Sequence, residues 1–351
     1  MEIMKQTKDF YKYELIKTAD ILVRDMIKLK KDETILITLD TKSDYRVADA
    51  IAGAAYSVGG KPMVVSIATP LASYKDADKY LPLETLTAAL NKTDVWIQIN
   101  MSSLLYSTPY NISYKENPNL RFCAYGMGVH VDSFVSLIGR LNFKAQKIFQ
   151  GRLTERTRNA KIMRITTPSG GDVTFENNPK WPIMNEDGSA DTPGSHMMAG
   201  QIGWTPFFES INGTIIFDGS VYPLGLIDVP IKLHIKEGNI VKIEGGRMAF
   251  EYEKFLKSFN HPMMLRMAHL CYGLNRGAKL SGNTMEDERV WGCIEWGIGA
   301  VGPMLVPGGV EAPAHSDGIC LNASVWLDNI QIMKESDFID SELKELADNL
   351  K

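Results

Sequence analysis

The first part of the chain alternates between helical and strand-like hydrophobic patterns. From Tyr11 to Lys30, apolar residues recur every three or four positions, which predicts an amphipathic helix. The run ETILITLD predicts a buried strand, and the next helix presents an apolar face and stops at Gly59-Gly60, before a second strand, KPMVVSI. This order is typical of a β-α-β unit with parallel strands.

The alternation continues to about residue 155. TDVWIQIN and NLRFCAYG predict two further strands, SSLLYSTPY a loop between them, and FKAQKIFQGRLTERTRNA a helix. We therefore expect an α/β fold in which residues 1–155 form an N-terminal open α/β layer domain. This region contains neither G-x-G-x-x-G nor G-x-x-x-x-G-K-S/T, so no nucleotide site is predicted.

Beyond residue 155 the pattern changes to short strands separated by turns. KIMRITT and VTFENN flank a PSGGD turn, and a KEGN turn joins PIKLHIKEG to NIVKIEGG. A Gly- and Pro-rich passage runs from Pro179 to Pro206, and a loop is predicted through SGNTMEDERVWGCIEWGIG. FEYEKFLKSF and SELKELADNLK predict helices. Residues 156–351 are thus expected to form a mixed α+β domain.

Composition narrows the class of function. The chain has 351 residues, of which 44% are hydrophobic and 23% charged, which is typical of a globular protein with two sizeable cores. A net charge of -4 argues against a nucleic-acid partner and favours a small-molecule substrate. The four cysteines lack C-x-x-C spacing, the N-terminus does not resemble a signal peptide, and no apolar run spans a membrane. These features predict a cytoplasmic location without membrane contact.

A candidate metal site lies in the second domain. His315 and Asp317 form an H-x-D pair, and alternate side chains of an extended strand leave the same face. His269, in MAHLCYGLN, can supply a third ligand, and two histidines with one carboxylate leave half of an octahedral shell open. H-x-D also occurs by chance, so the alternatives are a surface turn for the pair and an ordinary half-buried histidine at position 269.

Several segments together resemble the aminopeptidase T superfamily. They are ETILITLD and VGGKPMVV in the first domain, and RITTPSGGDVTF, INGTIIFDG, IKEGNIVKIEGG, HLCYGLN and HSD in the second. The resemblance implies a homodimer and one of two chemistries. The metallo-aminopeptidases hold two metals with a set that includes glutamates, one before a Thr-Pro that resembles Thr205-Pro206. GQIGWTP lacks that glutamate, and His269 stands where a second is expected.

The pattern is closer to the single-iron branch, 2,5-dihydroxypyridine 5,6-dioxygenase. On that resemblance His269, His315 and Asp317 are the ligands of an iron(II) ion. EDGSADTPG resembles a stretch near that branch's substrate pocket, which makes Glu186 and His196 candidate catalytic residues. The branch has a histidine implicated in proton transfer in an L-L-H-S-P loop, where this chain has Tyr106. A phenol has a pKa of about 10, so Tyr106 would be a weaker base than an imidazole at neutral pH.

These expectations have alternatives. Glu186 can be a solvated carboxylate, Tyr106 can simply cap apolar surface, and Glu295 can be either a buried carboxylate that orients a ligand histidine or an exposed one. The charge run of residues 286–289 is expected to be an exposed face. The sequence predicts an iron(II) enzyme that cleaves a hydroxylated nitrogen heterocycle. The alternatives are a metal-dependent hydrolase, a leucyl aminopeptidase or a cyclic amidohydrolase using zinc, manganese or iron, and a binding protein without catalysis.

Overall fold

The computed structural model describes residues 11–350, which divide into two compact units. Unit 1 comprises the residues up to Leu141 and Gly188–Met198, and unit 2 comprises Asn142–Asp187 and the residues from Ala199 onward. None of the helices in the described range has the length and apolarity of a membrane span.

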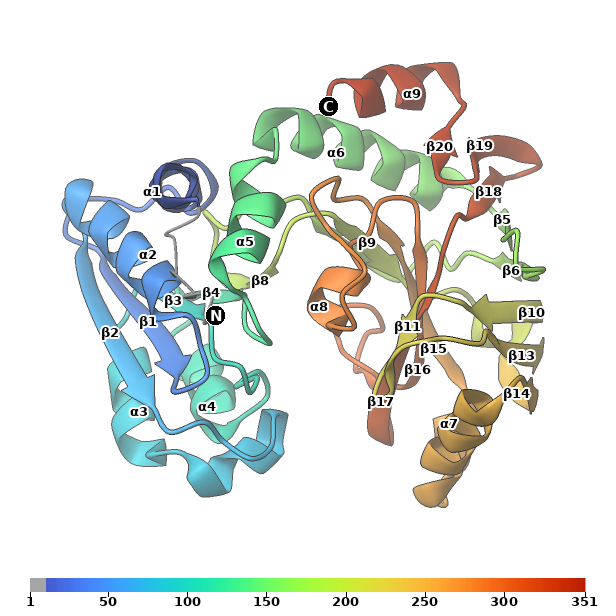
Figure 1. Ribbon diagram of the computed structural model, residues 1–351, viewed down its shortest axis with the longest axis horizontal. Coiled ribbons are helices and arrows are strands. Elements are labelled where there is room, and N and C mark those ends of the chain that lie inside the picture. The colour runs from blue at the N-terminus through green and yellow to red at the C-terminus, as the bar shows by residue number, and fades with distance from the viewer. Residues whose placement is uncertain (1–10, 351) are drawn as a thin grey trace, which may run out of the picture. The chain divides into compact units, whose positions relative to one another are not determined.

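Unit 1 is a parallel sheet with helices around it (Figure 1). Its strand order is β2-β1-β3-β4-β8. The strands are β1 (Thr34–Asp40), β2 (Lys61–Ile67), β3 (Val95–Gln98), β4 (Arg121–Ala124) and β8 (Gly194–Met197). The helices are α1 (Lys12–Asp20), which continues as a π-helical turn (Ile21–Met26), α2 (Tyr45–Ser57), a 3-10 segment (Tyr74–Tyr80), α3 (Leu83–Leu90), α4 (Thr108–Glu116), α5 (Val131–Phe134) and a π-helical turn (Val135–Gly139).

The register of unit 1 confirms the predicted parallel β-α-β unit. Thr34 to Asp40 pair with Lys61 to Ile67 in parallel. Alternation along the strands gives the sheet two apolar faces. On one of them Leu36, Trp96 and Phe122 pack against residues of α3 and α4.

Within the described residues, unit 2 contains two sheets. The order of the eight-stranded sheet is β14-β13-β10-β6-β5-β18-β19-β20, and that of the seven-stranded sheet is β12-β11-β17-β16-β15-β9-β7. The first comprises β5 (Ile162–Thr166), β6 (Asp172–Glu176), β10 (Asn212–Phe217), β13 (Ile231–Lys236), β14 (Asn239–Glu244), β18 (Ser324–Leu327), β19 (Ile330–Lys334) and β20 (Asp337–Phe338). The second comprises β7 (Ile183–Glu186), β9 (Gln201–Trp204), β11 (Ser220–Val221), β12 (Gly225–Leu226), β15 (Met267–Gly273), β16 (Ile294–Val301) and β17 (Val310–Cys320).

Four α-helices complete unit 2 in the described range: α6 (Phe143–Asn159), α7 (Arg247–Ser258), α8 (Thr284–Asp287) and α9 (Ser341–Asp348). There are also two 3-10 segments, Phe208–Ser210 and Pro262–Leu265. As predicted, β13 and β14 form an antiparallel hairpin. Its turn residues Glu237 and Gly238 both have positive φ, 49° and 72°, as a tight two-residue turn requires.

The main core of unit 2 lies between its two sheets. Phe175 of the eight-stranded sheet contacts Trp296 of the seven-stranded sheet edge to face, with ring centroids 5.7 Å apart. Leu270 and Ile294 belong to the same buried cluster. From Leu270 onward in β15 and from Ile294 to Ile298 in β16, even-numbered residues therefore face the core and odd-numbered residues face the other side of the sheet. Met267 lies before the register shift in β15 and also belongs to this core.

Two segments differ from the sequence expectations. The boundary expected near residue 155 falls inside α6, which belongs to unit 2 because Phe149 and Leu153 are buried in that unit's core. The passage from Pro179 to Pro206 contains three strands, β7, β8 and β9, and β8 joins the sheet of unit 1. Gly188 and Pro193 lie between β7 and β8, and Gly200 lies between β8 and β9. Each of these strands is only four residues long, too short for a clear period.

Candidate metal centre

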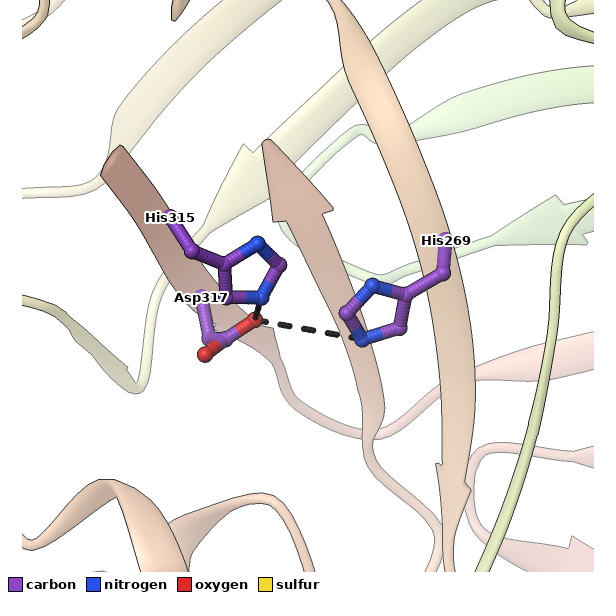
Figure 2. Close-up of side chains that lie close together, drawn as sticks. All are labelled: His269, His315 and Asp317. Atoms are coloured by element: carbon purple, nitrogen blue, oxygen red, sulfur yellow. Dashed lines mark ion pairs between the residues drawn. The ribbon is translucent and has the colours of Figure 1, made fainter. Parts of the chain in front are cut away.

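Three adjacent strands bring the predicted metal ligands to one face of the seven-stranded sheet. His269 lies on β15, and His315 and Asp317 lie on β17. Between them runs β16, in which Gly297 is paired with Asp317 and Gly299 with His315. The three predicted ligands project from the same face of the sheet (Figure 2). The surface-turn alternative for the H-x-D pair is wrong, because both residues are in a strand.

The side chains converge on one point. His315 Nε2 lies 2.8 Å from Asp317 Oδ1, and His269 Nε2 lies 3.9 Å from the same oxygen. The two imidazoles are nearly parallel, with an interplanar angle of 7° and centroids 5.1 Å apart. Figure 2 shows both Nε2 atoms directed at the carboxylate. One ligand atom from each residue lies within 4.8 Å of the other two.

A glycine leaves the space between the two rings. A Cβ at Gly297 would lie 2.4 Å from both Cε1 and Nδ1 of His269 and 2.9 Å from Cε1 of His315, closer than non-bonded carbon atoms approach. On the other side, the β15–β16 register shifts between Met267 and Leu270. Such a bulge re-aims a side chain. The bulge and Gly297 together allow His269 to reach across β16 toward His315.

Hydrogen bonding prepares His315 to be a ligand through Nε2. Its Nδ1 lies 2.6 Å from the carbonyl oxygen of Ala300, to which it donates. When one ring nitrogen donates its hydrogen to a backbone carbonyl, the other nitrogen of the neutral ring has a free lone pair that can bind a metal. The side chain is 34% exposed, whereas those of His269 and Asp317 are only 11% and 17% exposed.

The charges of the cluster are strongly coupled. Burial lowers the pKa of His269 despite the nearby Asp317 carboxylate. For His315, burial acts downward, but Asp317 outweighs it and raises the pKa. For Asp317, burial acts upward, but His315 and His269 outweigh it, and its pKa lies well below the usual range. Asp317 is thus an anion at neutral pH, as a metal ligand must be.

A second carboxylate adjoins the three ligands. Glu295, on β16, is completely buried, and its Oε2 lies 3.3 Å from Nε2 of His269. Burial, followed by the charges of Asp317 and Glu288, raises the pKa of Glu295 well above its usual value. Of the two alternatives for this residue, the structure shows the buried carboxylate.

This arrangement fits a divalent cation. The cluster contains two imidazoles, which bind metals in their neutral form, and one anionic carboxylate. This set is typical of iron(II), and zinc and manganese accept the same donors. Asp317 Oδ1 is buried, and although His315 Nε2 lies 2.8 Å away, this oxygen meets the geometry of a hydrogen bond with no residue in the described part of the chain. A buried carboxylate oxygen without a donor is costly, and a cation would compensate it.

Tyr106 belongs to unit 1, in the loop between β3 and α4. It adopts a left-handed backbone conformation, with φ 63°, immediately before Ser107, which caps α4. Its ring packs near Tyr74 and edge-on to Tyr110, with centroids 6.3 and 5.8 Å away. Although the residue is 44% exposed, desolvation of the phenol raises its pKa. Tyr106 therefore carries its proton at neutral pH.

The other two predicted catalytic residues lie in different units. Glu186 ends β7 in unit 2 and is 6% exposed, so it is not a solvated carboxylate. His196 lies on β8 in unit 1, where Nε2 is 2.7 Å from the carbonyl oxygen of Thr192. Neither belongs to the cluster formed by His269, His315 and Asp317.

Two features of this region differ from the sequence expectations. A loop is expected through the segment GCIEWGIG, yet it forms most of β16, the strand that separates the ligands. The alternation of Ile294, Trp296 and Ile298 is the signal of a strand, obscured by the glycines between them. The run of residues 286–289 is not an exposed face, because Asp287 and Arg289 are fully buried. The Arg289 guanidinium donates to Glu288 and to Gln201.

Comparison with known proteins gives the family. Residues 22–340 match the model of the family described as 2,5-dihydroxypyridine 5,6-dioxygenase. The chain belongs to this family. A curated relative of the same description, from Pseudomonas putida KT2440, is 26% identical over 202 residues, which is 53% of this chain and 56% of that relative. The chain thus spans little more than half the length of this curated relative.

Two solved structures share the fold. The structure of 2,5-dihydroxypyridine dioxygenase from Pseudomonas putida KT2440 has a TM-score of 0.77 and 18% identity, over 94% of this chain and 98% of that one. Wild-type AmpT from Thermus thermophilus has a TM-score of 0.67 and 13% identity, over 94% and 100%. These matches confirm the expected α/β fold, which the chain shares with AmpT. Membership of a dioxygenase family also implies a metal cofactor, and it does not favour the hydrolase alternative.

Proposed function

We propose that this protein is a mononuclear non-haem iron(II) dioxygenase that opens the ring of a hydroxylated nitrogen heterocycle similar to 2,5-dihydroxypyridine. The observation that carries the proposal is the convergence of His269, His315 and Asp317 on one point, in a chain of this family. Such a set leaves half of an octahedral shell for substrate and oxygen. Zinc or manganese could occupy the same donors, but zinc has no redox chemistry with which to activate oxygen.

The protein's own residues have defined tasks in this proposal. The Ala300 carbonyl oxygen fixes the tautomer of His315, and Asp317 supplies one negative charge, which would offset half the charge of a divalent ion. Bound iron(II) would supply a Lewis acid that acidifies a coordinated substrate hydroxyl, together with the redox chemistry that oxygen activation needs. The ring carbon–carbon bond breaks as both atoms of one oxygen molecule enter the product. The substrate provides the electrons, so no external reductant is consumed.

Three residues are candidates for proton transfer: Tyr106 is the strongest, Glu186 is next and His196 is the weakest. Tyr106 carries its proton at neutral pH, so its role would be to donate a proton or a hydrogen bond rather than to act as a resting base. Glu186 is a buried carboxylate in unit 2 and is the candidate acceptor. His196, whose Nε2 contacts a carbonyl oxygen, is the weakest candidate because that nitrogen already has a partner.

The test is oxygen uptake by anaerobically purified protein reconstituted with iron(II). With 2,5-dihydroxypyridine we expect one oxygen molecule consumed per ring opened, and both atoms of labelled oxygen in the product. His315→Ala should abolish both iron binding and uptake. An iron-loaded protein that consumes no oxygen with this compound or its hydroxylated relatives would refute the proposal, and metal-dependent hydrolysis of leucyl substrates would support the hydrolase instead.

We also propose a homodimer, supported only by the resemblance. Light scattering on the purified protein at micromolar concentration should give twice the chain mass of 39.1 kDa. A mass of one chain that does not change with concentration would rule this out.

A further inference from the structure

We propose that Glu295 is a fourth protein ligand of the metal ion held by His269, His315 and Asp317. This proposal rests on the proposed function, because it assumes that those three residues bind a metal. It changes the expected coordination from two histidines and one carboxylate to two histidines and two carboxylates.

Glu295 approaches His269 from the side on which the metal would bind. A carboxylate that merely orients a ligand histidine contacts the ring nitrogen that does not bind the metal. Glu295 Oε2 is instead 3.3 Å from Nε2 of His269, the nitrogen that also faces Asp317 Oδ1. Glu295 is therefore on the metal side of the imidazole.

The distances between the donor atoms suit a shared ion. With metal–ligand bonds of about 2.1 Å, adjacent donor atoms of an octahedron lie about 3.0 Å apart and opposite ones about 4.2 Å. The 3.3 Å between Glu295 and His269 and the 2.8 Å between His315 and Asp317 are close to the separation of adjacent donors. The 3.9 Å between His269 and Asp317 falls between the two values.

The Glu295 carboxylate has an ion-pair contact with His269 but no hydrogen bond among the described residues. It is 0% exposed, and neither of its oxygens meets the geometry of a hydrogen bond with any residue from 11 to 350. Its strand neighbour on β15 is Cys271, whose thiol is at best a weak donor, and the neighbouring Asp317 is an anion that offers no donor. A cation is the partner that such a site lacks.

The position of Glu295 on the sheet is consistent with this role. It precedes Gly297 by two residues on β16, so both face the side that carries His315 and Asp317. The absent side chain of Gly297 leaves room for the rings of His269 and His315 beside Glu295 on this face. A fourth ligand would leave two positions of an octahedron for exogenous ligands instead of three.

The decisive experiment is a crystal structure of the wild-type protein loaded with Mn(II) under anaerobic conditions. We expect one Glu295 carboxylate oxygen within about 2.3 Å of the ion. A distance beyond about 3 Å, with the ion held by the other three residues, would overturn the proposal while leaving the metal centre intact.

Titration with Co(II), followed by its absorption, tests the same point in solution. We expect Glu295→Gln to weaken Co(II) binding at least about 100-fold, the upper end of what loss of an outer-shell partner costs. Glu311→Gln, which removes an exposed carboxylate from β17, is the matched control and should bind as wild type does. If wild type binds Co(II) and His315→Ala does not, but Glu295→Gln binds within threefold of wild type, only the fourth ligand is refuted. If wild type binds no Co(II), the proposed centre fails with it.

Discussion

Gly297→Ala is the sharpest test of how the centre is built. The new methyl carbon would lie 2.4 Å from two atoms of the His269 ring and 2.9 Å from His315. Ordinary carbon contacts are about 3.5–4.0 Å, so the ring of His269 must move by roughly 1 Å. The side chains of a functional site must be held within about 0.5 Å of their working geometry, so a shift of this size should disrupt metal binding.

The expected cost has two parts. Overpacking of this kind destabilises a fold by about 1–3 kcal/mol. Misplacement of a ligand by roughly 1 Å should lower turnover about 100-fold or more, even in protein that is folded and supplied with excess iron. Gly297 has no positive φ that would strain alanine, so the whole effect should be steric.

Three measurements check this expectation: metal affinity by anaerobic titration, turnover by oxygen uptake, and thermal unfolding with chelator present. Gly151→Ala is the matched control, because Gly151 lies within α6 of the same unit and a Cβ added there would meet nothing within 4 Å. That change should stabilise the protein by about 0.5–1 kcal/mol. A Gly297→Ala protein with metal affinity and turnover within threefold of wild type would show that the rings do not need this space.

Other contacts lead to three more predictions. Tyr106→Phe should lower turnover by about 100-fold or more while metal affinity stays unchanged, and unchanged turnover would exclude Tyr106 from proton transfer. Removing the metal by chelation should lower the free energy of unfolding, since a ligand at 100 times its dissociation constant stabilises by about 2.7 kcal/mol; thermal unfolding that ignores added metal would contradict the site. Asp340 caps α9 and pairs with Arg156 at 3.0 and 3.3 Å, and although burial acts upward, Arg156 lowers its pKa. Asp340→Asn should therefore cost about 1 kcal/mol at pH 7. Urea unfolding should show the difference between the two proteins closing as the pH falls from about 4, where the unfolded carboxyl gains its proton, toward the lowered pKa of the folded one. A difference that is the same at pH 3 and pH 7 would refute the ion pair.

The sequence predicted the cluster of candidate ligands better than the strands that carry them. His315 and Asp317 are two residues apart, so a strand of any register places them together. The distance to His269 and the space at Gly297 depend on how β15, β16 and β17 align, which no local pattern encodes. The sequence therefore suggested which side chains to consider but not that a glycine would separate the two rings.

The fold was predictable where an element was long enough to show a clear hydrophobic pattern. The helix and two strands around Gly59-Gly60 are seven or more residues each and were expected correctly. Short strands between turns were not, because four residues are too few to show alternation. The burial of Arg289 also could not be predicted, since its partner Gln201 is far away in the sequence.

The strand β8 has a consequence for how the chain can be made. It pairs with β4 at the edge of the parallel sheet, but it is synthesised after residues 142–187, which belong to the other unit. Until β8 has been synthesised, the backbone hydrogen-bonding groups on the outer side of β4 remain exposed. Such an open sheet edge is prone to pair with other chains. A fragment ending at Leu141 would keep this edge exposed permanently. Supplying residues 188–198 as a separate peptide should restore its solubility, much as a missing strand is donated between partners.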